Sequence, residues 1–148
     1  MSQENPAVVF AAIGYAGGFP ALGAAKGHPQ QNGPVGVFRS IDGGANWTPL
    51  TNVLPAVAAT DLAIDPTDAD TLYAAIGDIF GNAGNGIYKS VNGGDSWTKL
   101  AGGLPAGMGR ISLGLAPSQP QRLYALFTRV ANATGGNAST ENVFRSDN

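Results

Sequence analysis

Two carboxylates of this 148-residue chain, Asp78 and Glu141, lie in stretches rich in Gly and Asn that are typical of long loops. Hydrolysis of a glycosidic bond requires two carboxyl groups across the bond, roughly 5 Å apart for retention or about 6.5 to 9.5 Å apart for inversion. The two residues meet only if the fold brings their loops together. They are the candidate catalytic residues, and the competing interpretation is a chain without catalytic groups.

Side chains suited to binding sugars occur in the same kind of segment. Aromatic rings stack on the C–H faces of sugar rings, while amide and charged side chains donate and accept the hydrogen bonds that hydroxyl groups need. The candidate ligand-binding residues are Tyr15, Phe19, His28, Asp78, Phe80, Asn82, Asn85 and Arg129. The competing interpretation is that these segments are solvated turns rich in Asn and Gly.

Metal and cofactor chemistry finds little support in the residue types. His28 is the only histidine and the chain has no cysteine, which excludes a His-based metal cluster and all thiolate chemistry. Asp65, Asp68 and Asp70 surround Pro66 without the Gly-centred loop and distal Glu of a calcium site, so we interpret them as turn-forming residues. We expect no metal and no cofactor.

The elements that must position these loops are indicated by a box that occurs twice in one frame, at residues 40–47 and 90–97. An Asp or Asn followed by two glycines predicts a hairpin turn, in which the side-chain oxygen accepts backbone hydrogen bonds and the glycines supply conformational freedom. The Trp is expected to bury its ring in the next strand. We assign a structural role to the shared positions, Ser40, Asp42, Gly44, Trp47, Ser90, Asn92, Gly94 and Trp97.

The repeat extends beyond the box and predicts the fold class. Short runs of β-branched and aromatic residues in the middle copy predict strands at 61–65, 71–76, 86–91 and 96–100. Four antiparallel strands per repeat predict an all-β chain of β-propeller blades. The predicted blades are an incomplete one at 7–56, a complete one at 57–107 and an incomplete one at 108–148, which together form a partial ring of about two and a half blades.

Alternating strand direction assigns the connections to two faces of the fold. The box turns lie on one face. The connections between second and third strands, roughly residues 15–34, 77–85 and 129–142, lie on the other. Loops of this length inside a compact repeat are usually functional, and all the candidate ligand-binding and catalytic residues fall within them.

The motif Ser-x-Asp-x-Gly-x-x-Trp at residues 40–47 resembles the Asp-box, or bacterial neuraminidase repeat. The surrounding sequence, over nearly the whole chain, resembles Asp-box β-propellers of the sortilin type and the xyloglucan-hydrolase kind. Such repeats occur in sialidases, endoglucanases, sorting receptors and assembly factors, so the resemblance implies a fold more than a function. Residues 76–81 resemble the xyloglucan-hydrolase segment with a catalytic Asp, here Asp78, but lack its Thr and double Gly.

A sialidase would require a cluster of three arginines. Arg39, Lys89 and Arg145 occupy equivalent positions in successive repeats, so they do not form such a cluster. The eight basic and ten acidic residues are spread without runs, which argues against nucleic acid and anionic membranes as partners. No apolar run has the length of a membrane span, and residues 1–6 lack the features of a signal peptide. The resemblance to secreted bacterial propellers nevertheless implies an extracellular or periplasmic location.

Three functions are consistent with the sequence. The first is a non-catalytic propeller scaffold or binding module that presents its long loops to a glycan or a protein partner. The second is a fragment of a glycoside hydrolase acting on a β-glucan such as xyloglucan. The third is a self-assembling fragment, because partial blades do not close a ring in one copy. Missing blades of a longer propeller or further copies of the chain are then the expected partners.

Overall fold

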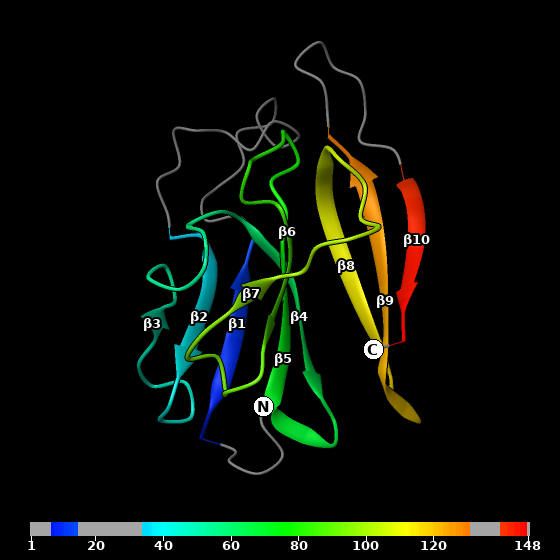
Figure 1. The fold of residues 1–148 in the computed structure, drawn as a ribbon. Helices are drawn as coiled ribbons and strands as arrows, with labels where there is room; N and C mark the ends of the chain where they lie inside the picture. Colours follow the sequence, from blue (N-terminus) through cyan, green and yellow to red (C-terminus); the bar gives the residue numbers. More distant parts are fainter. Residues whose placement is uncertain (1–6, 15–33, 131–139, 148) are drawn as a thin grey trace.

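The described part of the protein consists of three antiparallel β-sheets placed side by side (Figure 1). The computed structural model describes residues 7–14, 34–130 and 140–147, with the backbone alone described at 140 and 141. The first sheet has the order β1 (Val9–Ile13), β2 (Gly36–Ser40), β3 (Thr48–Pro49). The second has the order β4 (Ala59–Asp65), β5 (Asp68–Ile76), β6 (Gly86–Ser90), β7 (Thr98–Lys99). In the third, β9 (Gln119–Arg129) lies between β8 (Met108–Ala116) and β10 (Thr140–Ser146).

The predicted all-β fold of a partial propeller is confirmed, and the strands differ from the predicted ones mainly at their ends. β4 and β5 continue almost to their connecting turn, where Asp65 Oδ1 accepts a hydrogen bond from the N–H of Thr67 at 2.8 Å. β6 ends at Ser90 and β7 starts only at Thr98, because the residues between them form the box turn. The described part of the chain contains no helix long and apolar enough to cross a membrane.

Two apolar layers hold the three sheets together, and β5 contributes to both. Ala74 and Ile76 pack in the layer between the first and second sheets, while Tyr73 and Ala75 pack in the layer between the second and third. All four side chains are buried. Successive side chains of a strand point to opposite faces of its sheet, so a sheet covered on both faces needs apolar residues at every position. The continuous apolar run in this strand follows from that requirement.

The second and third sheets are also joined by side-chain hydrogen bonds between their first strands, β4 and β8. Thr60 Oγ1 donates to the carbonyl of Ile111 at 2.6 Å and accepts from the N–H of Ile111 at 3.3 Å. Asp61 Oδ2 accepts from the N–H of Leu113 at 2.8 Å. Backbone groups of β8 that face the neighbouring sheet are thereby satisfied, which fixes the position of one sheet against the other.

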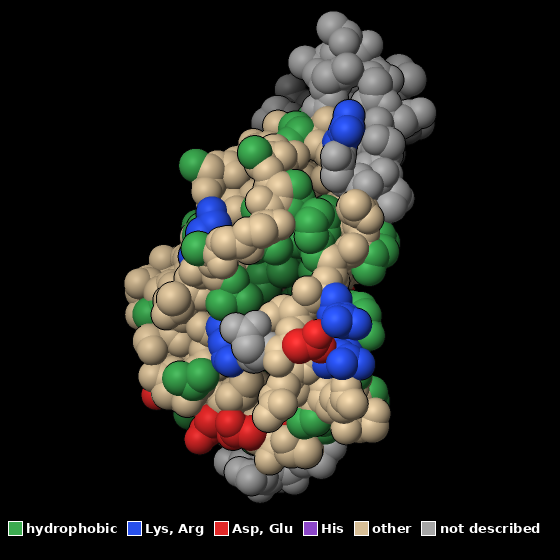
Figure 2. All heavy atoms as spheres, turned by 45° about the vertical axis from the view of Figure 1, so that its right-hand side comes forward, with side chains coloured by type: hydrophobic (Ala, Val, Ile, Leu, Met, Phe, Trp, Pro, Cys, Tyr) green, Lys and Arg blue, Asp and Glu red, His purple; other side chains and the backbone are tan. Residues whose placement is uncertain are grey.

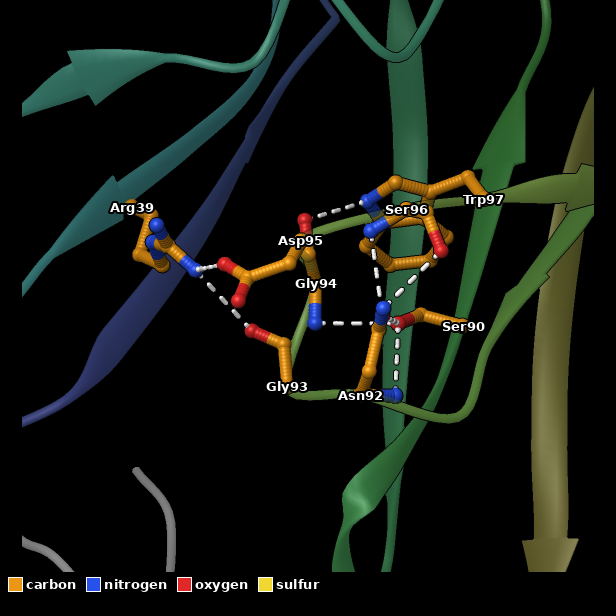
Figure 3. A network of polar contacts seen from close by, with 8 residues as sticks. All are labelled: Arg39, Ser90, Asn92, Gly93, Gly94, Asp95, Ser96 and Trp97. Carbon is orange, nitrogen blue, oxygen red and sulfur yellow. Dashed lines mark hydrogen bonds and ion pairs between the residues drawn. The ribbon is translucent and has the colours of Figure 1, made fainter.

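The second box, residues 90–97, forms a closed turn between β6 and β7 (Figure 3). Ser90 Oγ accepts from the N–H of Gly94 at 2.9 Å, and Asn92 Oδ1 accepts from the N–H of Ser96 at 3.0 Å. Gly93 and Gly94 have φ values of 65° and 86°, a conformation that a Cβ would disfavour. Two side-chain acceptors and two glycines therefore define the turn.

Arg39 of β2 reaches from the first sheet to this turn (Figure 3). Its Nη1 donates to the carbonyl of Gly93 at 3.2 Å and lies 2.5 Å from Oδ1 of Asp95. The Asp95 side chain is exposed, so the ion pair itself adds little stability in water. The hydrogen bond to the backbone carbonyl links the two sheets in one register.

The first box, residues 40–47, makes the same turn with a charged acceptor. Asp42 Oδ1 accepts from the N–H of Asn46 at 2.9 Å and from Ser40 Oγ at 2.7 Å, and Oδ2 accepts from Asn46 Nδ2 at 2.7 Å. These hydrogen bonds, those from Asn46 first, lower the pKa of Asp42 from 3.8 to about 2. Asn92 makes equivalent bonds without a charge, so the turn requires an acceptor rather than an ionised group.

The two box tryptophans differ in burial, which corrects the expectation that both rings are buried. Trp97 is half-buried against the layer between the first and second sheets, whereas Trp47 is 41% exposed. Each indole Nε1 donates to a carbonyl of its own turn at 2.9 Å, Trp97 to Gly94 and Trp47 to Gly44. The hydrogen bond is local, but burial requires a neighbouring sheet, and Phe10 of the first sheet approaches Gly94 closely.

Replacing Asp42 by Asn tests this account of the box. Because the folded-state pKa of Asp42 is depressed, its contribution to stability is present above about pH 3.8 and is lost as the pH falls toward about 2. We expect Asp42→Asn to lose less stability than the wild type over this interval, as measured by urea unfolding at a series of pH values. The reverse change, Asn92→Asp, should add acid sensitivity. Identical pH dependence in all three proteins would contradict the account.

Candidate functional site

The loop between β5 and β6, residues 77–85, lies on the face opposite the box turns (Figure 1). Of the three loops predicted for this face, it is the one that the structure describes in full. Tyr15, Phe19 and His28, the candidates in the first loop, lie outside the described residues. The candidate site is therefore built from this loop and the adjacent part of the third sheet.

Asn85 holds the loop together from inside and is only 4% exposed. Its Oδ1 accepts from the N–H of Asp78 at 2.9 Å, while its Nδ2 donates to the carbonyl of Asp78 at 2.9 Å and to that of Met108 at 2.6 Å. An amide matches this environment because it combines an acceptor with two donors. Asn85 supports the loop and links it to the third sheet, where the sequence suggested a ligand contact.

The loop packs directly on the third sheet. A Cβ at Gly77 would lie 2.6 Å from the carbonyl oxygen of Gly109, so the approach of the two backbones requires a glycine at this position. Gly81 has a φ of 88°, and a Cβ there would lie 3.2 Å from Cγ1 of Val130, which follows β9. The loop and the end of the third sheet thus form one continuous surface.

Phe80 is the exposed aromatic residue of this loop, with 38% of its surface accessible. Its N–H donates to Asp78 Oδ1 at 2.8 Å, and Asn82 Oδ1 accepts from the N–H of Gly84 at 2.8 Å. Among the described residues, the second carboxylate oxygen of Asp78 and the amide nitrogen of Asn82 have no hydrogen-bond partner. Within the part of the chain that the structure describes, the loop therefore offers an aromatic ring together with an available acceptor and an available donor.

Two arginines of the third sheet lie near the same surface. Arg129, predicted within a loop, is the last residue of β9 and is exposed. Arg110 is exposed in β8, two residues beyond Met108, to which the loop is hydrogen-bonded. The pairing of β8 with β9 shifts at this point, and the N–H of Arg110 donates to Thr128 Oγ1 at 2.9 Å. Arg110 is not among the site residues predicted from the sequence, and Gly109, within the interval where the register shifts, is the sequence signal that could have indicated this bulge.

The structure also changes the assignment of Glu141. The third loop is shorter than predicted because Thr140 pairs with Thr128, so the hairpin of β9 and β10 extends further and Glu141 falls within β10. β10 is an edge strand of the third sheet, while Asp78 follows β5 of the second. The side chain of Glu141 lies outside the described atoms, and its pairing with Asp78 stays a prediction.

The box face carries the remaining carboxylates that were considered for metal binding. Asp68 Oδ1 accepts from the N–H of Asp70 at 3.1 Å, and Asp68 Oδ2 accepts from Thr71 Oγ1 at 2.7 Å. These contacts are those of a turn. Within residues 7–14, 34–130 and 140–147, no group of three or more His, Asp or Glu side chains is arranged to hold a metal ion.

Comparison with solved structures shows a propeller-type fold similar to that of GH74 enzymes. The chain aligns over 95% of its length with a GH74 enzyme from Niastella koreensis (TM-score 0.58, 20% identity) and with the GH74 xyloglucanase from Xanthomonas campestris (TM-score 0.56, 16% identity). It spans 18% and 19% of those chains. An ancestral GH74 enzyme aligns over 74% of the chain at 25% identity, with a TM-score of 0.48. No protein-family model matches the chain, and no curated protein is significantly similar to it.

The role of Asn85 in the site can be measured by replacing it with Ala. The change leaves the N–H and carbonyl of Asp78 and the carbonyl of Met108 without their partner, so we expect stability to fall by about 1–3 kcal/mol in urea unfolding. Hydrogen exchange of the Asp78 amide should accelerate. Asn82→Ala, on the exposed side of the same loop, is the control and should change stability by no more than about 0.5 kcal/mol. Equal effects of the two variants would refute a supporting role.

Proposed function

We propose that the chain is a non-catalytic, glycan-binding part of a GH74-like propeller, and that its 77–85 loop contacts the glycan. The observation that carries this proposal is the exposed ring of Phe80 on a loop where, among the described residues, Asp78 keeps an available acceptor and Asn82 an available donor. A sugar presents apolar C–H faces and hydroxyl groups together, so its recognition calls for this combination.

The rigidity of the loop supports the same proposal. Ordering a flexible loop on binding costs free energy, and a loop already fixed by Asn85 and by the Gly77 contact avoids much of that cost. The exposed Arg110 adds a cationic donor at the edge of the surface. A neutral polysaccharide with many hydroxyl groups suits a loop that presents an aromatic ring beside dispersed polar groups.

The glycan class that we propose is a β-glucan of the xyloglucan type. The structural similarity to a xyloglucanase over 95% of the chain supports this choice at the level of fold. Because the chain matches only 19% of that enzyme, we propose glycan binding and not hydrolysis. Asp78 is the one carboxylate in the described loop, and a glycosidase needs two. Binding therefore needs fewer assumptions than catalysis.

Removal of the Phe80 ring tests the binding proposal. With xyloglucan oligosaccharides as the probe in isothermal titration calorimetry, we expect Phe80→Ala to weaken binding at least about tenfold, or ~1.4 kcal/mol. Val91→Ala is the matched control, since Val91 is an exposed apolar residue that follows β6 in the box turn, on the opposite face. An unchanged affinity in Phe80→Ala, or no binding by the wild type, would exclude this site.

A second function, hydrolysis, is favoured by one observation: an Asp78 carboxylate oxygen without a partner among the described residues, next to an exposed aromatic ring. We expect the wild-type chain to release no reducing ends from xyloglucan. Asp78→Asn keeps an acceptor for the N–H of Phe80, so it should preserve the loop and serves as the matched variant. Release by the wild type that disappears in Asp78→Asn would instead establish the hydrolase.

A further inference from the structure

The outer face of the third sheet, which points away from the second sheet, exposes large apolar side chains. Tyr124 and Leu126 of β9 are 39% and 38% exposed, and Val143 of β10 is 59% exposed. Val143 is paired directly with Leu126 in the sheet, so the side chains are neighbours. In Figure 2 hydrophobic side chains appear along the right-hand edge of the molecule, beside a group of basic and acidic ones. We call Tyr124, Leu126 and Val143 the outer patch.

The same positions in the second sheet are covered. The counterparts of Tyr124, Leu126 and Val143 are Tyr73, Ala75 and Ile87, and Ile87 pairs with Ala75 as Val143 pairs with Leu126. These three side chains are almost fully buried in the layer between the second and third sheets. The outer patch thus has the chemistry and register of a surface that packs on another sheet.

The first sheet repeats this arrangement in its turn. The counterparts there are Phe10, Ala12 and Val37, with Val37 paired with Ala12, and they pack in the layer between the first and second sheets. In both interfaces, therefore, the side chains at these positions pack against the sheet that follows. We expect the outer patch to pack against a sheet in the same way.

The receiving surface is present on the first sheet, at the opposite end of the molecule (Figure 1). Ala11 and Ile13 of β1 point away from the second sheet and are half-buried. Their counterparts, Ala74 and Ile76, are fully buried because the first sheet covers them. Phe38, which pairs with Ala11, lies on the same apolar face and is buried, so the incompletely covered part of this face is that with Ala11 and Ile13.

The two groups that would form a further polar contact lie one on the third sheet and one on the first. Inside the chain, Arg39 donates to the carbonyl of Gly93 in the next sheet. Arg145 of β10 is the repeat counterpart of Arg39, and Gly43 of the first box is the counterpart of Gly93. The N–H groups of Gly43 and Gly93 already make equivalent hydrogen bonds, to the carbonyls of Ala7 and Asp70. The backbone around Gly43 is therefore placed as it is around Gly93.

We propose that the outer patch binds a second copy of this chain, head to tail, on the face of its first sheet with Ala11 and Ile13. Tyr124, Leu126 and Val143 then become buried as their counterparts are, and Arg145 reaches the carbonyl of Gly43 in the other copy. Two copies associated in this way place six of the described sheets around one ring, which lies within the roughly four to eight blades of closed propellers. The head-to-tail contact then occurs twice in the dimer.

Stacking of sheets avoids the mismatch that edge-to-edge pairing creates. Joining two three-stranded sheets at their edges would give six strands where a blade holds four, whereas stacking leaves each sheet intact. A symmetric contact between two outer patches is disfavoured electrostatically. Arg122 and Arg145 flank the patch with Asp147 between them, so two such surfaces would meet with like net charge.

The test measures the mass of the 148-residue chain by sedimentation equilibrium over a concentration series. We expect the wild type to form a dimer, and we expect Leu126→Glu and Ile13→Glu each to raise the dissociation constant of that dimer at least about tenfold. Val91→Glu places the same charge at an exposed apolar position outside both faces and should leave the dimer unchanged. Circular dichroism and tryptophan fluorescence check that each variant is folded.

Mixing the two damaged variants distinguishes head-to-tail contact from other dimers. Ile13→Glu retains an intact outer patch and Leu126→Glu retains an intact first sheet, so an equimolar mixture should recover association through one native interface. A wild type that is monomeric at every concentration would overturn the proposal and leave the patch to another partner. A dimer that survives either variant, or variants that do not complement each other, would overturn it equally.

Discussion

The structure depends on one packing constraint: a sheet of this fold must be covered on both of its faces. In the second sheet β5 satisfies that constraint, because residues Leu72 to Ile76 are buried without exception. Because alternate residues of a strand serve opposite faces, a polar residue anywhere in this run would be placed in one apolar layer or the other. The apolar run, the small residues Ala74 and Ala75 and the close approach of the sheets are consequences of this double covering.

When both faces of a sheet are covered by apolar side chains, the backbone N–H and C=O groups at the margins of the sheet still need hydrogen-bond partners. Side chains of the box turns and of the first strands provide them. In both boxes a Ser hydroxyl accepts the N–H of a glycine, and an Asp or Asn oxygen accepts the N–H four residues later. At the first strands, Thr60 and Asp61 supply hydrogen bonds that a continuous sheet would provide from its own backbone. Side chains thus substitute for strand pairing where one sheet ends and the next begins.

The repeated part of this architecture could be predicted from the sequence, because residues at equivalent positions of the repeat have similar types and pack in the same way. The box turns, the four strands of the second sheet and the 77–85 loop follow from residues with strong local preferences. The different burial of Trp47 and Trp97 could not be predicted, since their local sequences are alike and only the neighbouring sheet differs. Arg129 and Glu141 were placed in a loop because Gly and Asn near them suggested a turn, whereas pairing of Thr140 with Thr128 lengthens the hairpin.

The candidate site depends on a residue that the other repeats do not share, so the repeat could not predict it. Asn85 has Val35 and Glu141 at the equivalent positions of the other repeats, so its hydrogen bonds to Asp78 and Met108 belong to the second sheet alone. Through Met108 the loop is fixed to the third sheet, and the position of Phe80 therefore depends on the packing between the two sheets as well as on the loop. A change in the apolar layer near Ile111 should be felt in the loop because Gly77 contacts the backbone of residues 109–111. The same inter-sheet packing that builds the scaffold thus also positions the surface that we propose for binding.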